Sequence, residues 1–200
     1  NVTITIESGT QLRNFPGINT YINNSKLTLD TNDFDTTDNL IINKNNKALI
    51  VSTDSTRTNV TIPNDVTIIG DYAFYQCTSL ASTEGETSLI IPDSVTSIGE
   101  YAFRECSSLT SLTIGNSVTS IGNYAFAKCS NLASTEGETS LIIPDSVKSI
   151  GFAAFFQCIN LKSVMIGNSV TSIGTYAFYL CSKLESVTIP DSVTTIGYNL

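Results

Sequence analysis

Five cysteines carry the most reactive side chains, because paired thiols form disulfides and clustered thiolates bind zinc. They follow one another at alternating 29- and 23-residue intervals and are Cys77, Cys106, Cys129, Cys158 and Cys181. The chain has no Cys-x-x-Cys pair and no histidine, so a zinc site is not expected. Cysteines at one site of successive repeats project in parallel from one face, which is a poor geometry for disulfides. We therefore expect buried free thiols that fill a core.

Four glutamates offer a second candidate chemistry. They lie in two Glu-Gly-Glu segments and are Glu84, Glu86, Glu136 and Glu138. If these segments lie two coils of a repeat apart, they are about 10 Å from each other, and their carboxylates could hold calcium. Neither segment has the Asp/Asn-rich spacing of a calcium loop. We favour two solvated bulges, with no resident metal and no cofactor.

Catalysis finds little support in the remaining polar residues. Ser and Asp recur in Pro-Asp-Ser triplets at 92–94, 144–146 and 190–192, but no histidine is available as a base. The glycines are isolated, so no phosphate-binding loop is indicated. We expect that the chain is not an enzyme and that these triplets form turns.

Charge and hydropathy narrow the choice of partners. Eighteen acidic and ten basic residues give a net charge of −8, which disfavours nucleic acid and anionic membranes as partners. The sequence contains no apolar run of about 18 residues, so no membrane span is expected. The low content of charged residues, 14%, suits an extracellular or cell-surface setting.

A repeat positions all of these residues. The glycines that follow an apolar pair keep the spacing of the cysteines; they are Gly70, Gly99, Gly122, Gly151, Gly174 and Gly197. The 29-residue unit is the 23-residue unit with a six-residue addition, and a 52-residue block that holds one of each has been duplicated whole. Residues 56–200 are thus an array of 23- and 29-residue units, of which the last is truncated. Stacked units of this kind bury a continuous core and form a solenoid.

The unit at 109–132 predicts the elements of each coil. Leu112 and Ile114 alternate with polar residues, as in a short half-buried strand. A second extended leg follows and ends at Gly122, which we expect to adopt a conformation that a β-carbon would resist. Phe126 and Cys129, with Leu132, recur every third residue, which predicts one or two helical turns.

Two aromatic rows follow the same spacing. The phenylalanines are expected in the core with the cysteines; they are Phe74, Phe103, Phe126, Phe155 and Phe178. A partial row of tyrosines precedes them, at Tyr72, Tyr101, Tyr124 and Tyr176, and Ala153 stands where the fifth would be. We expect these tyrosines to pack at the shoulder of the coil with their hydroxyls near water.

The residues from Ile91 to Leu109 read Ile-Pro-Asp-Ser-Val-Thr-Ser-Ile-Gly-Glu-Tyr-Ala-Phe-Arg-Glu-Cys-Ser-Ser-Leu. This pattern resembles the BspA-like, or Treponema pallidum-type, leucine-rich repeat, and the resemblance covers about residues 56–200. It implies an α/β leucine-rich-repeat solenoid: a strand-dominated, curved, right-handed coil with a parallel concave sheet and short helical turns on the other side. It also implies surface proteins of bacteria and mucosal protists that are associated with adhesion.

Residues 1–55 lack the repeat and are rich in Asn, Asp and Thr. Alternation predicts strands at 2–6, 26–29, 40–42 and 48–51, with a hairpin loop at 43–47. We interpret this region as an amino-terminal β-rich cap over the edge of the first repeat. The competing interpretation is a disordered linker.

The candidate binding surface is the concave face, where curved arrays commonly bind. Its outward strand positions, here called the outer strip, are Thr61, Ile90, Thr113, Ile142, Met165 and Thr188. Apolar side chains among hydroxyls mark either an interaction surface or merely a tolerant sheet. The expected function is an extracellular or cell-surface, adhesin-like module that binds host or cell-surface protein, with carbohydrate as a possible partner. The alternative is a non-binding stalk or spacer.

Overall fold

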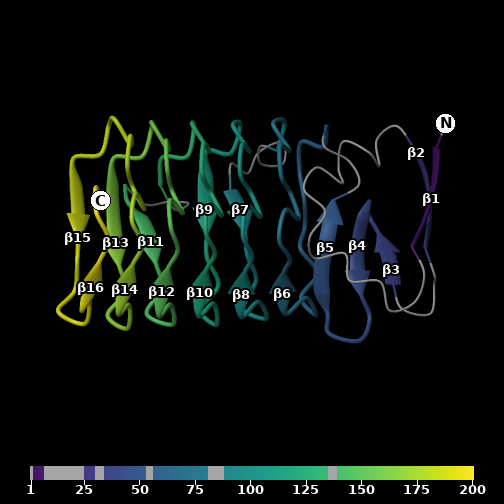
Figure 1. Cartoon of the computed structure of the whole chain (residues 1–200), viewed down its shortest axis with the longest axis horizontal. Coiled ribbons are helices and arrows are strands. Elements are labelled where there is room, and N and C mark those ends of the chain that lie inside the picture. The colour runs from purple at the N-terminus through teal and green to yellow at the C-terminus, as the bar shows by residue number, and fades with distance from the viewer. Residues whose placement is uncertain (1, 7–24, 30–33, 53–55, 81–87, 135–138) are drawn as a thin grey trace.

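The computed structural model describes residues 2–6, 25–29, 34–52, 56–80, 88–134 and 139–200. Within these ranges the chain is built from strands and turns, and its coils stand side by side along the long axis of the molecule (Figure 1). We number the coils by their cysteines: coil 1 holds Cys77, coil 2 Cys106, coil 3 Cys129, coil 4 Cys158 and coil 5 Cys181. The strand-dominated solenoid predicted from the repeat is confirmed.

The longest sheet runs through all coils. Its solenoid strands are two residues long: β6 (Ile68–Ile69), β8 (Ser97–Ile98), β10 (Ser120–Ile121), β12 (Ser149–Ile150), β14 (Ser172–Ile173) and β16 (Thr195–Ile196). They pair in parallel in chain order, and Ser120 faces Ser97 on one side and Ser149 on the other. One of these partners is separated from Ser120 by a short unit and the other by a long unit. The insertion in the long unit therefore leaves this sheet undisturbed.

The Leu-x-Ile strands form a second, interrupted row. They are β7 (Ser88–Ile90), β9 (Ser111–Thr113), β11 (Leu141–Ile143), β13 (Ser163–Ile166) and β15 (Ser186–Thr188). β7 pairs with β9, and β11, β13 and β15 pair with one another, but β9 and β11 belong to different sheets.

The expected single parallel sheet on this side is therefore divided, and the insertion explains why. Ser134 forms a parallel bridge with Ser111, and its carbonyl accepts a hydrogen bond of 3.1 Å from the amide of Leu112. Ser134 thus takes the place beside β9 that the next strand would take in a short unit. The strand that begins at Leu141 comes after the inserted residues and pairs with β13 of the coil that follows.

The third side of each coil consists of turns, and the short helical turns that we expected there are not found among the described residues. In coil 1, Tyr72 and Gln76 have positive φ angles of 60° and 57°. The amides of Tyr72, Phe74 and Gln76 donate hydrogen bonds of 2.7–2.9 Å to carbonyls of coil 2. A helix is about 10 Å across with its side chains, whereas coils lie about 4.8 Å apart. Turns that bond to the next coil fit this spacing, and helices do not.

Glycine is required at the repeated glycine positions for a different reason from the one we expected. The φ angle of Gly122 lies outside the left-handed region, and the residues that occupy this region are instead its neighbours in the turns, such as Tyr124 and Lys128. A β-carbon on Gly122 would lie 2.6 Å from the main-chain carbon of Gly99 in the preceding coil. Glycine is needed because two backbones approach each other closely.

The core is one continuous column. Leucine, isoleucine and valine from both strand rows enclose the phenylalanines and cysteines of the turn side. Phe74, Phe103, Phe126 and Phe155 are completely buried. Consecutive phenylalanine rings stack at centroid distances of 4.9–5.3 Å, close to the spacing between strands. The phenylalanines and the cysteines both lie in this core.

The amino-terminal part extends the long sheet. β3 (Phe34–Thr37), β4 (Leu40–Asn43) and β5 (Ala48–Ser52) are antiparallel neighbours, and β5 pairs in parallel with β6. Two further strands, β1 (Val2–Ile6) and β2 (Ser25–Leu29), form a separate parallel pair. The predicted hairpin between β4 and β5 is present, and β5 pairs along the edge of the first coil as a cap would. The domain boundary at residue 55 stays a prediction.

Arg57 links the turn between β3 and β4 to the start of the array. Its guanidinium, which is almost fully buried, donates hydrogen bonds of 2.8 Å to the carboxylate of Asp38 and 2.7 Å to the carbonyl of Asn59. Asp38 and Asn39 both have positive φ, at 50° and 57°, which is the geometry of a two-residue type I′ turn between β3 and β4.

Candidate functional site

The five cysteines are free and buried. Each thiol from coil 2 onward donates a hydrogen bond to a phenylalanine carbonyl of an earlier coil, as between Cys129 and Phe103 at 3.2 Å. Burial raises the pKa of the Cys106, Cys129 and Cys158 thiols well above the ordinary value, so they are protonated at neutral pH. These thiols are part of the core and are not nucleophiles.

Cys181 in coil 5 differs from the other cysteines in its exposure and its pKa. It is 8% exposed, and a hydrogen bond with the thiol of Cys158 lowers the pKa of Cys181. It is the thiol that reagents reach most readily.

The acidic candidates Glu84, Glu86, Glu136 and Glu138 lie outside the described residues. Among the residues that are described, no three His, Cys, Asp or Glu side chains gather closely enough to hold a metal ion. The calcium hypothesis for the two bulges stays untested. Within the same described residues, no helix is long and apolar enough to cross a membrane.

The Pro-Asp-Ser triplets at 92–94 and 144–146 each join one coil to the next. The carboxylate of Asp93 accepts a hydrogen bond of 2.6 Å from the main-chain amide of Asn116, and Asp145 does the same for Asn168. The aspartates are therefore engaged in contacts between coils.

The outer strip is present as two patches. Ile90 pairs with Thr113 across β7 and β9, while Ile142, Met165 and Thr188 are consecutive partners across β11, β13 and β15. Ile90 and Met165 are each 50% exposed. Thr61 is exposed and lies outside the described strands. Each patch presents uncharged side chains on a rigid sheet, and this geometry suits contact with a flat apolar surface.

An aromatic row on the turn side contains a second candidate site. Tyr72, Tyr101 and Tyr124 stack at centroid distances of 4.8–4.9 Å. At coil 4 the row changes, because Ala153 has no ring. The ring of Phe152 stands there instead, edge-on to Tyr124 at 5.2 Å and to Tyr176 at 5.6 Å.

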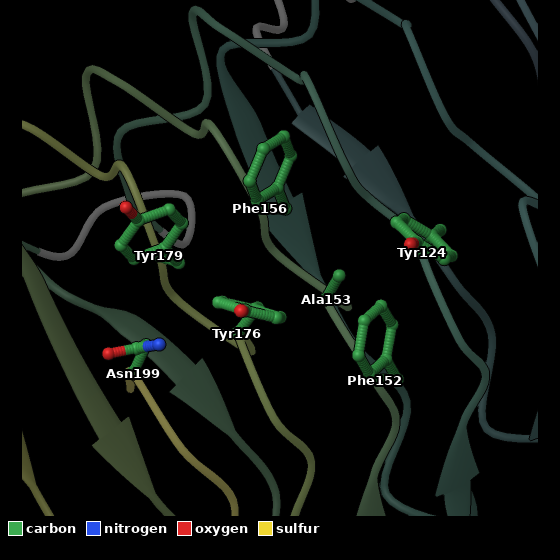
Figure 2. Close-up of a pocket in the computed structure, with 7 residues that line it drawn as sticks. All are labelled: Tyr124, Phe152, Ala153, Phe156, Tyr176, Tyr179 and Asn199. Carbon is green, nitrogen blue, oxygen red and sulfur yellow. The ribbon is translucent and has the colours of Figure 1, made fainter.

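This substitution leaves an aromatic groove of about 350 Å³. It is lined by Tyr124, Phe152, Ala153, Phe156, Tyr176, Tyr179 and Asn199. Figure 2 shows the methyl group of Ala153 at its centre, with the aromatic rings around it. The sequence revealed the departure at Ala153, but nothing in it indicated that Phe152 would move into the row or that a groove would remain.

In coils 1 to 3, tyrosine rings on the turn side surround a cation, the guanidinium group of Arg104. The guanidinium carbon of Arg104 lies 5.7 Å from the ring centroid of Tyr101, 5.8 Å from Tyr75 and 6.0 Å from Tyr124. These distances are typical of cation–π contacts.

The carboxylate of Glu105 fixes this cation in place. It lies 3.3 Å from the Arg104 guanidinium and 3.0 Å from the Lys128 ammonium, and it accepts a hydrogen bond of 2.9 Å from Gln76. Partial burial acts to raise the pKa of Glu105. The hydrogen bonds from Gln76 and Lys128 and the two positive charges more than offset this effect, so its pKa lies below the ordinary value.

The repeat geometry agrees with a family comparison. The model of the BspA type leucine rich repeat region matches residues 52–141 and 134–200, in six copies. The chain belongs to this family. The family resemblance drawn from residues 91–109 is thereby confirmed, and no curated protein matches the BspA-type chain.

Solved structures place this BspA-type array among bacterial leucine-rich repeat proteins. A leucine rich cell surface protein of Faecalibacterium prausnitzii is 32% identical, with a TM-score of 0.69, over 80% of this chain and 40% of its own length. The T. pallidum leucine rich repeat protein is 26% identical, with a TM-score of 0.65, over 86% of this chain and 81% of its own. The pneumococcal vaccine antigen PcpA, at 21% identity and a TM-score of 0.61, covers 85% of this chain and 38% of its own, and it shares the fold.

Proposed function

We propose that this BspA-type array is the binding module of an adhesin-like protein at the cell surface or outside the cell. Two findings support the setting: the family match and the likeness to a cell surface protein of Faecalibacterium prausnitzii, of which the chain spans about 40% of the length. We assign no catalytic site among the array residues that the structure describes, and we infer that the activity is recognition.

The observation that carries the proposal is the register of Ile142, Met165 and Thr188. Backbone pairing holds these three side chains on adjacent strands, and Met165 is half exposed. Exposed apolar patches commonly mark protein contact sites. Side chains that a rigid sheet already orders lose little freedom on binding. We infer that this patch, with Ile90 beyond the interruption, contacts a protein partner on the predicted concave side.

Arginine substitutions test this proposal. The triple variant Ile90→Arg, Ile142→Arg and Met165→Arg places three charges on the outer strip. Beads coated with the chain are scored for attachment to epithelial cells and to immobilised matrix proteins. We expect attachment to fall by about tenfold or more, as for loss of interface anchors.

The matched control is Ile159→Arg. Ile159 is an apolar side chain with 42% exposure that lies just after Cys158, on the turn side and away from the outer strip. This variant is expected to attach like the parent. Attachment that survives the triple substitution would contradict the proposal and favour a stalk. Attachment that is lost only after enzymatic deglycosylation of the target would favour carbohydrate as the partner.

A further inference from the structure

We propose that the aromatic groove at coil 4 binds the guanidinium group of an arginine side chain exposed on a partner protein. The groove lies on the turn side of the array. The inference goes beyond the proposed adhesive role and does not depend on the outer strip being the adhesive surface.

The array itself contains a guanidinium held among aromatic rings of the same two rows. Arg104 stands two residues before Cys106, and the residue at the same place in coil 4 is Phe156. In coils 1 to 3, three tyrosine rings surround the guanidinium of Arg104 at 5.7–6.0 Å. In coils 3 to 5, the same two rows supply aromatic rings and no cation. Phe156 stands in the place of Arg104, and the free space lies beside it, where Ala153 stands in the place of Tyr101.

The unfilled space has a local cause. A tyrosine at position 153 would continue the stack of Tyr101 and Tyr124, whereas Ala153 offers only a methyl group. Phe152 enters the row edge-on, at 62° to Tyr124, and does not restore the stack. Ring faces and edges from coils 3, 4 and 5 are left around the groove (Figure 2).

The chemistry of the lining favours a delocalised cation. Five of the seven described lining residues are aromatic and none of the seven carries a charge. Ring faces carry negative potential that attracts a guanidinium, and tyrosine hydroxyls and the Asn199 amide can accept its hydrogen bonds. The net charge of −8 favours the approach of a cation over that of an anion.

Short peptides test the site without a cellular partner. The 200-residue chain is titrated with acetyl-Gly-Arg-Gly-amide and with the same peptide containing citrulline, which keeps the shape of arginine and lacks its charge. Binding is followed by the NMR shifts of the aromatic side chains. A single cation–π site is weak, so we expect millimolar affinity for the arginine peptide and about fivefold or weaker binding of the citrulline peptide.

Two variants locate the binding. Phe152→Asn with Ala153→Tyr turns residues 151–155 into Gly-Asn-Tyr-Ala-Phe, which is the native sequence of coil 3 from Gly122 to Phe126. This variant should fold like the parent and lose the arginine-dependent shifts, because a tyrosine ring fills the groove. Phe156→Arg with Gln157→Glu copies the Arg104-Glu105 pair of coil 2 and should also block the peptide.

The Ile159→Arg control should keep binding, and circular dichroism with thermal unfolding checks that every variant folds. Equal binding of the arginine and citrulline peptides would overturn the proposal, as would unchanged binding to the Phe152→Asn/Ala153→Tyr variant. Cellobiose is titrated in parallel. Saturable shifts of the groove residues with this sugar and none with the arginine peptide would assign the groove to carbohydrate instead.

Discussion

The thiol of Cys106 donates a hydrogen bond to the carbonyl oxygen of Phe74 in the preceding coil, with a sulfur–oxygen distance of 3.2 Å. The same contact recurs at Cys158 and Phe126. This recurring geometry along the array means that cysteine does more than fill space of the right size. It also provides a donor for a carbonyl that is buried in the core.

Replacing one of these thiols by an apolar group of similar size isolates the contribution of the donor. Cys129→Val leaves the carbonyl of Phe103 without the thiol hydrogen bond. The carbonyl keeps its hydrogen bond of 3.2 Å from the main-chain amide of Cys106, so only a second donor is lost. We expect the free energy of unfolding to fall by about 0.5–1.5 kcal/mol, the net contribution of one hydrogen bond. Urea unfolding followed by circular dichroism measures this change. A variant as stable as the parent would show that the thiol acts only as an apolar filler.

The same thiols predict a loss of stability in alkali. Burial raises the pKa of Cys106, Cys129 and Cys158 in the folded chain, so their contribution is complete below the ordinary value of 9.0. Above that pH the unfolded thiols release protons while the folded ones do not. Stability therefore falls as pH rises from 9 towards the folded pKa values, by about 1.4 kcal/mol per pH unit for each thiol.

Unfolding curves between pH 8 and pH 11 test this slope, and Cys129→Val serves as the comparison. The variant lacks one of the three thiols named above, so its stability should fall less steeply by about one proton per molecule. Parallel slopes for the parent and the variant would contradict the assignment.

Thiol labelling distinguishes Cys181 from the other four cysteines. Cys181 is 8% exposed and has a lowered pKa, while the other four cysteines are completely buried. We expect an aromatic disulfide reagent to modify Cys181 first in the native chain and the others only after unfolding. Mass spectrometry of the labelled peptides identifies the order. Early modification of Cys106 or Cys129 would contradict the packing described above.

Removing a glycine at a close backbone contact and introducing one at a positive φ angle should affect stability differently. Gly122→Ala places a methyl group against the backbone of Gly99, so it should destabilise the fold by more than about 1 kcal/mol. Gln157 is a residue with a side chain and a positive φ of 56°. Gln157→Gly relieves this conformation and should leave stability unchanged or raise it by up to about 1 kcal/mol. Thermal unfolding of both variants provides the test, and destabilisation by Gln157→Gly would contradict it.

Most of the coil was predictable because each unit repeats the same apolar positions. Leu112 and Ile114 alternate as in a strand, and Phe126 and Cys129 keep their places from one coil to the next. This is why the solenoid, its core and the family could all be inferred from residues 56–200.

The features that the sequence did not predict correctly share one physical cause: each depends on contacts between neighbouring coils. The spacing of Phe126, Cys129 and Leu132 is the same in a helix and in a chain of turns, and only the distance between coils decides between them. Gly122 was expected to adopt an unusual conformation because a single coil cannot show which backbone lies against it. The groove was likewise hidden, since it depends on how Phe152 packs after Ala153 removes a ring.

The long sheet keeps its register whether a short or a long unit separates one of its strands from the next. Extra residues inserted next to the other strand row therefore do not change the register of the long sheet. Each coil still lengthens the array by about 4.8 Å. Copying the 52-residue block advances it by two such steps, or about 10 Å. Duplication of this block in the gene can therefore lengthen the array in fixed steps, while the structure of each coil stays the same.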